Sequence, residues 1–91
     1  MAGVDRRSKK PELYWIDFYS NMQEMNFAAH GHAAYFVMST MDAYWHDSMT
    51  EQEAMALLKK CLDELAVRYI GNFKQFFVKK VSLKGVETLN L

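Results

Sequence analysis

The chain has 91 residues, and 51% of them are hydrophobic, which argues against a disordered segment. Eleven basic and eleven acidic residues give a formal net charge of zero, so the charge gives no support for binding to nucleic acid or to an anionic membrane. The length predicts one small domain or part of one, with no second domain. Six Phe, five Tyr, two Trp and seven Met are too many for so short a chain to bury alone. We therefore expect extensive contacts with other protein chains.

The first predicted element is a β-hairpin. Residues 12–18 (Glu-Leu-Tyr-Trp-Ile-Asp-Phe) form a short aromatic run that favours a strand. Residues 1–4 are predicted to be its partner strand. Between them, residues 5–11 are polar and contain the only proline, which indicates an exposed loop. We interpret the basic residues of this loop, and Lys79 and Lys80 further on, as a solvated turn and a strand edge.

A helix is predicted over residues 27–46. Its first half is rich in alanine around Gly31, and its second half is bulky. A glycine inside a helix is unfavourable by about 1 kcal/mol relative to alanine, which suggests that a neighbour packs closely against it. Small residues here therefore predict a close-packing surface.

The second predicted helix, residues 51–70, has the best-marked beginning. Thr50 and Glu53 have the spacing of a capping box, and Gly71 is suited to the C-cap. The apolar residues recur every three or four positions, as in an amphipathic helix. They are Ala54, Leu57, Leu58, Cys61, Leu62, Leu65 and Tyr69.

A second hairpin is predicted at the end of the sequence. Residues 73–83 are β-branched and aromatic, Lys84-Gly85 indicates a tight turn, and residues 86–91 would form the returning strand. The predicted order is strand-strand-helix-helix-strand-strand. This order is typical of an α+β fold in which helices cover one face of an antiparallel sheet.

The histidines do not have the spacing of a metal site. His30 and His32 are two positions apart, which on a helix separates their directions by about 200°. On a strand the two would share a face, but the alanine run favours a helix. Buried or interface histidines are the simpler interpretation, and we predict no metal and no cofactor. Cys61 lies on the predicted apolar stripe, where a structural thiol is more common than a nucleophile.

A single cysteine fits a reducing compartment. The sequence has no apolar run of membrane-spanning length, and residues 1–12 do not have the apolar region of a signal peptide. We therefore expect a protein of the cytoplasm and nucleus.

Four segments together resemble the beta subunits of the 20S proteasome, most closely the non-catalytic beta type 2 subunits at the fourth position of the beta ring. The segments are ELYWID, FAAHGHAAYFVMSTMDAYWH, MTEQEAMALLKKCLDELAVRYIGN, and FFVKKV with KGV after it. The similarity covers nearly all 91 residues. It corresponds to the second half of a proteasome beta subunit, with the upstream half absent.

The resemblance implies the C-terminal half of a four-layer αββα fold, that of the N-terminal-nucleophile hydrolases. Active members cleave peptides with an N-terminal threonine from the first half of the chain. They also have a supporting serine where this sequence has His32, an aspartate where it has Tyr69 and a serine where it has Asn72. The changes at all three positions imply a non-catalytic subunit, because neither tyrosine nor asparagine replaces these groups in proton transfer.

The same resemblance implies partners, namely other alpha and beta subunits in stacked rings, and a structural role in ATP- and ubiquitin-dependent protein degradation. The residues that we expect to pack or to form interfaces are Ala29, Gly31, His32, Ala33, Trp45 and Cys61. Two alternatives remain. One is a fragment of a catalytically active threonine-protease subunit. The other is a stand-alone α+β binding module with residues 30–32 lining a ligand pocket.

Overall fold

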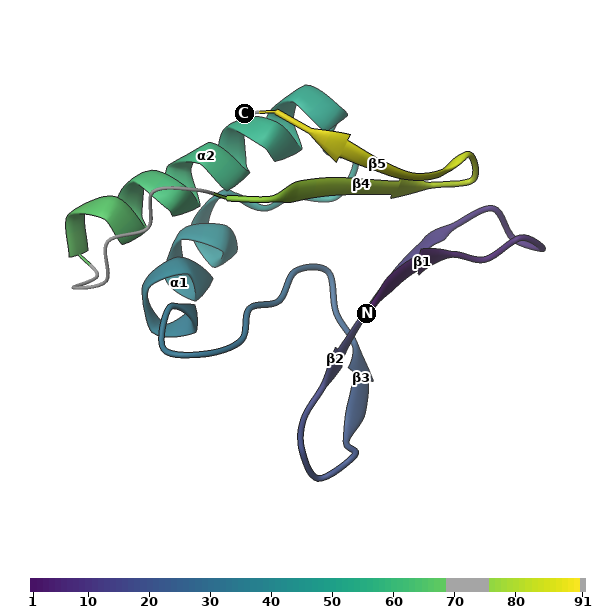
Figure 1. Cartoon of the computed structure of the whole chain (residues 1–91), viewed down its shortest axis with the longest axis horizontal. Helices are drawn as coiled ribbons and strands as arrows, with labels where there is room; N and C mark the ends of the chain where they lie inside the picture. Colours follow the sequence, from purple (N-terminus) through teal and green to yellow (C-terminus); the bar gives the residue numbers. More distant parts are fainter. Residues whose placement is uncertain (69–75, 91) are drawn as a thin grey trace. The chain divides into compact units, whose positions relative to one another are not determined.

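The computed structural model describes residues 1–68 and 76–90, which form two compact units. The strand unit consists of residues 1–28 and 77–90, and the helix unit begins at residue 29 and contains both helices (Figure 1). Antiparallel strands and two helices confirm the α+β class.

Three strands form the first sheet of the strand unit, in the order β1-β2-β3: Ala2–Val4, Pro11–Ile16 and Met22–Glu24. The first part of β2 pairs antiparallel with β1, and the second part pairs antiparallel with β3. The hairpin predicted from residues 1–4 and 12–18 is therefore confirmed, with its second strand running from Pro11 to Ile16.

The predicted element order is wrong at one point, because β3 was not expected. Its sequence, Met-Gln-Glu, is short, largely polar and exposed, so no apolar alternation marks it as a strand. Hydrogen bonds to Asp17 stabilise the turn that returns the chain to it. The Oδ1 atom of Asp17 accepts from the amides of Tyr19 and Asn21, both at 2.9 Å. Such Asx turns need only one short acidic side chain.

Strands β4 (Val78–Ser82) and β5 (Gly85–Leu89) form the second predicted hairpin, in the register Val78↔Leu89 to Ser82↔Gly85. Both strands are shorter than expected, and residues 73–75 and 91 lie outside the described ranges. Gly85 has a φ of +115°, a conformation that glycine adopts without steric cost. Within the strand unit, β4 also contacts β1.

Helix α1 spans Ala34–Tyr44, so the prediction of a helix over residues 27–46 is wrong at its beginning. Gly31 adopts a φ of +84°, in the left-handed region, and a turn follows it. The amide of Ala34 bonds to the carbonyl of Gly31 at 3.1 Å. The alanine-rich sequence suits a helix, but the left-handed glycine delays its start. The helix ends where Trp45 becomes extended.

Helix α2 spans Glu51–Arg68, as predicted to within two residues, and Tyr69, Ile70 and Gly71 lie outside the described ranges. The capping box is confirmed. The amide of Glu53 donates to the Thr50 hydroxyl at 3.2 Å, and the amide of Thr50 donates to the Glu53 carboxylate at 3.5 Å.

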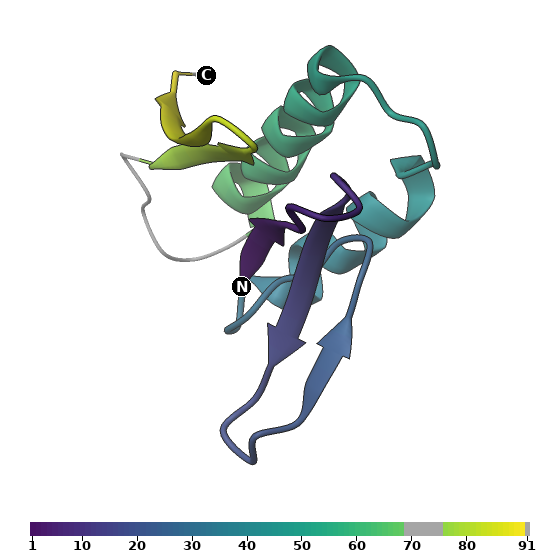
Figure 2. The same ribbon diagram turned by 90° about the vertical axis from the view of Figure 1, so that its right-hand side faces the viewer.

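The two helices lie side by side (Figures 1 and 2). They pack against each other around a small core. Its buried residues are Val37, Leu57, Cys61 and Leu65. The predicted apolar stripe of α2 is thus largely correct, although Ala54 at its beginning is exposed. No described residue of the strand unit is buried. Across residues 1–68 and 76–90, no helix combines the length and apolar character that crossing a membrane requires.

Candidate functional site

Four of the six residues expected to pack or form interfaces come together in the helix unit. Ala29, Ala33 and Trp45 are partly buried against the core that contains buried Cys61. Ala29 and Ala33 precede α1, Trp45 follows it, and Cys61 lies on α2. Within this chain the four therefore serve the packing of one helix against the other. Whether they also contact other chains stays a prediction.

Gly31 and His32 lie apart from this cluster and are exposed. A Cβ atom added at Gly31 would meet no atom within 4 Å, so the prediction that a helical Gly31 faces a close neighbour is wrong within this chain. His30 and His32 flank the left-handed turn and are both exposed. Helical spacing therefore does not set the directions of these two side chains, and neither is a buried histidine.

Cys61 has the environment of a structural thiol. It is 5% exposed, and burial raises the pKa of its thiol. A raised pKa keeps the sulfur protonated at neutral pH, and the thiolate is the reactive form.

The part of the chain that the structure describes contains no group of three or more His, Cys, Asp or Glu residues placed to hold a metal ion. Tyr69 and Asn72, two of the positions at which the resemblance implies helper residues in active members, lie outside the described ranges.

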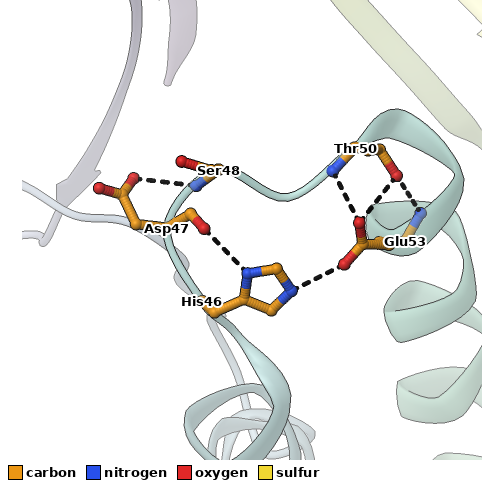
Figure 3. A network of polar contacts seen from close by, with 5 residues as sticks. All are labelled: His46, Asp47, Ser48, Thr50 and Glu53. Atoms are coloured by element: carbon orange, nitrogen blue, oxygen red, sulfur yellow. Dashed lines mark hydrogen bonds and ion pairs between the residues drawn. The ribbon is translucent and has the colours of Figure 1, made fainter.

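A polar network joins the end of α1 to the beginning of α2, and His46 is at its centre (Figure 3). The Nδ1 atom of His46 lies 2.8 Å from the carbonyl oxygen of Asp47, and Nε2 lies 2.7 Å from Oε2 of Glu53. Only the protonated imidazole can donate to both acceptors. The carbonyl of Asp47, followed by the carboxylate of Glu53, raises the pKa of His46.

The carboxylate of Glu53 belongs to both the network and the capping box. One of its oxygens faces His46, and the other accepts from the Thr50 hydroxyl at 3.2 Å (Figure 3). The hydrogen bond from His46, followed by those from Thr50, lowers the pKa of Glu53. The sequence predicted the capping box but not the histidine, because no local pattern links residues seven positions apart across a loop.

Comparison with known families identifies the fold to which these elements belong. Residues 1–81 match the family model described as Proteasome subunit. The chain belongs to the proteasome subunit family.

Among similar proteins, the "Probable proteasome subunit beta type-4" of Neurospora crassa is 37% identical over 86 residues, which are 94% of this chain and 42% of that protein. The "Proteasome subunit beta type-4" of Saccharomyces cerevisiae is 34% identical over 90 residues, covering 99% of this chain and 46% of the relative. The "Proteasome subunit beta type-2" of Trypanosoma brucei brucei is 36% identical over 75 residues, which are 82% of this chain and 36% of that protein.

These relatives confirm the expected resemblance to proteasome beta subunits, and they have both the type-4 and the type-2 names. The chain spans less than half the length of each of the three. The two helices and antiparallel strands agree with the α+β half of an N-terminal-nucleophile hydrolase domain that the sequence led us to expect.

Proposed function

We propose that this chain is part of a non-catalytic, structural beta subunit of the 20S proteasome core particle. It would contribute to ring assembly and so to ATP- and ubiquitin-dependent protein degradation. The observation that carries this proposal is the match of residues 1–81 to the proteasome subunit family, with relatives named beta type-4 and beta type-2.

The surface of the chain supports a role that depends on partners. Among the residues that the structure describes, four form the buried core, all in the helix unit, whereas many large apolar side chains are exposed. Those exposed by more than half are Met1, Phe18, Tyr19, Met22, Tyr35, Tyr44, Val67, Phe77, Leu83 and Val86. Monomeric proteins rarely expose so much apolar surface, and contacts with other subunits would cover it. Neighbouring alpha and beta subunits are the partners that we propose.

The proposal of a non-catalytic subunit rests on the sequence differences from active members. His32 stands where the resemblance places a supporting serine, and it lies on an exposed turn next to Gly31. Tyr69 and Asn72 replace the other two helper residues in the sequence. A fragment of an active threonine-protease subunit is the second candidate, and these three differences weigh against it.

The direct test is to tag the full-length product of this gene in its native cells. We expect the tagged subunit to co-sediment with the 20S particle and to remain unlabelled by a threonine-directed covalent inhibitor that labels the active sister subunits. Failure to co-sediment would overturn the assignment to the particle. Labelling would instead identify a catalytic subunit. The same tag would test the proposed cytoplasmic and nuclear location by imaging.

Of the residues predicted to form interfaces, Gly31 and His32 lie on an exposed turn and do not belong to the core cluster. We expect a neighbouring subunit to pack on this turn. Gly31→Leu adds bulk at a φ of +84°, and overpacking an interface costs about 1–3 kcal/mol. Gly31→Ala introduces similar backbone strain with little bulk. Incorporation into the particle should fall for Gly31→Leu and persist for Gly31→Ala. Equal incorporation of both variants would contradict close packing at this turn.

A further inference from the structure

Positive charge is concentrated on one turn and one hairpin of the strand unit. Residues 5–11, between β1 and β2, and residues 78–89, which form the β4–β5 hairpin, contain seven of the eleven basic residues and two of the eleven acidic ones. Their net charge is therefore +5, in a chain whose net charge is zero. Such local concentration of one charge attracts ligands of the opposite sign even when the whole chain is neutral.

This turn and this hairpin line one groove of about 440 Å³, which we call the basic groove. Lys9 lies on the first turn, Lys80 and Lys84 lie on the hairpin, and Glu87 is the one acidic residue among the described residues of the lining. Aliphatic side chains complete the lining: Val4, Pro11, Val81 and Leu83. The groove thus combines ammonium groups with aliphatic surface.

Two of these lysines have no acidic partner in the ranges that the structure describes. Neither Lys9 nor Lys84 forms an ion pair there. The described lining holds three lysines and one glutamate, a net charge of +2 (3 − 1), so an anionic ligand would reduce the repulsion among the lysines.

Hydrogen bonds hold both rims of the groove in place before any ligand arrives. On the first turn, the amide of Lys9 donates to the carbonyl of Asp5 at 2.7 Å, and the amide of Asp5 donates to the carbonyl of Lys10 at 3.0 Å. On the hairpin, the amide of Lys84 donates to the hydroxyl of Ser82 at 3.2 Å. Ordered rims reduce the entropy lost when a ligand binds.

We infer that the basic groove is a docking site for an acidic peptide segment of another protein. Carboxylates would contact the lysines, and small apolar side chains would contact the aliphatic lining. Nucleic acid is disfavoured because none of the described residues that line the groove is aromatic, and single-stranded bases bind by stacking on aromatic rings. This inference does not depend on the proposed function, since it follows from the charge and lining of the strand unit alone.

The test is fluorescence anisotropy with the full chain and a short labelled peptide that alternates Glu and Ala. The double variant Lys9→Gln/Lys84→Gln should raise the Kd about tenfold, because two exposed charge contacts together contribute about 1.4 kcal/mol. The variant Lys59→Gln/Lys60→Gln removes the same charge from α2 and should change the Kd less than about twofold. The variant Lys9→Arg/Lys84→Arg keeps the charge and should retain binding.

Three results would overturn the inference. One is no measurable binding of the acidic peptide, or binding equal to that of the same peptide with Gln in place of Glu. Another is an equal loss of affinity in the groove and α2 variants, which would indicate attraction by net charge alone. The third is tighter binding of an oligothymidylate of the same charge that also depends on Lys9 and Lys84, which would make the partner a nucleic acid. The proposed function is tested separately, by incorporation of the subunit into the proteasome. None of these binding results decides that test.

Discussion

Truncation of Leu65 tests whether α1 and α2 form a specifically packed core. Leu65 is 8% exposed, and Leu→Ala at buried sites destabilises proteins by about 2–5 kcal/mol. Because the cluster has four buried residues, its neighbours can relax into the space, and we expect a value near about 2–3 kcal/mol. Complete native domains of this length have a stability of about 5–14 kcal/mol, so the loss would be a large fraction even of that range. With an m value of about 1 kcal/mol/M in urea, the unfolding midpoint should fall by about 2 M or more.

The assay is a urea titration followed by far-UV circular dichroism, whose helical signal comes from α1 and α2 among the described elements. Val67 provides the matched control, since it lies two positions further along α2 and is 83% exposed. Val67→Ala should change the free energy of unfolding by no more than about 0.5 kcal/mol. Similar midpoints for the two variants, or a loss at Leu65 below about 0.5 kcal/mol, would refute a packed helix pair.

Three further predictions concern the caps and turns. Thr50→Ala should destabilise α2 by about 1 kcal/mol, measured by the same titration, because the first turn loses a hydrogen-bond acceptor; Thr50→Ser should restore it. Two hydrogen bonds raise the pKa of the His46 imidazole. The contribution of His46 to the free energy of unfolding is therefore present below about pH 6.5 and is lost as the pH rises through the raised pKa. The melting-temperature difference between wild type and His46→Gln should therefore shrink from about pH 6 to pH 8. Gly85→Ala should weaken the β4–β5 hairpin by about 1–2 kcal/mol because of its φ of +115°, whereas Gly3→Ala should be tolerated; amide hydrogen exchange of β4 measures both.

Local patterns predicted α2 well and α1 poorly, for different physical reasons. The capping box and the three-to-four spacing of apolar residues act within a few positions, so they can be recognised in the sequence. The start of α1 depends on Gly31, which is compatible with a weak helix and with a left-handed turn. Alanines on both sides favour the helix, and the structure has the turn. A preference of about 1 kcal/mol is too small to distinguish these outcomes without the tertiary contacts.

The sequence suggests residues for the candidate site but not their geometry. Ala29, Ala33 and Trp45 lie against the core that contains Cys61. Their small and apolar chemistry suits a core and an interface equally, so the sequence does not distinguish contacts within the chain from contacts between chains. The bond between His46 and Glu53 is also a long-range feature, since it depends on how the loop between the helices folds back.

The position of the single cysteine gives this chain a built-in reporter. Cys61 is the only thiol, and it lies between α1 and α2 with its sulfur protonated. A thiol-specific reagent can therefore reach it only when the helices separate, so the rate of labelling measures how often they open. The labelling rate of this native cysteine would then report the opening of the helix pair, both in the free chain and in any assembly that contains it.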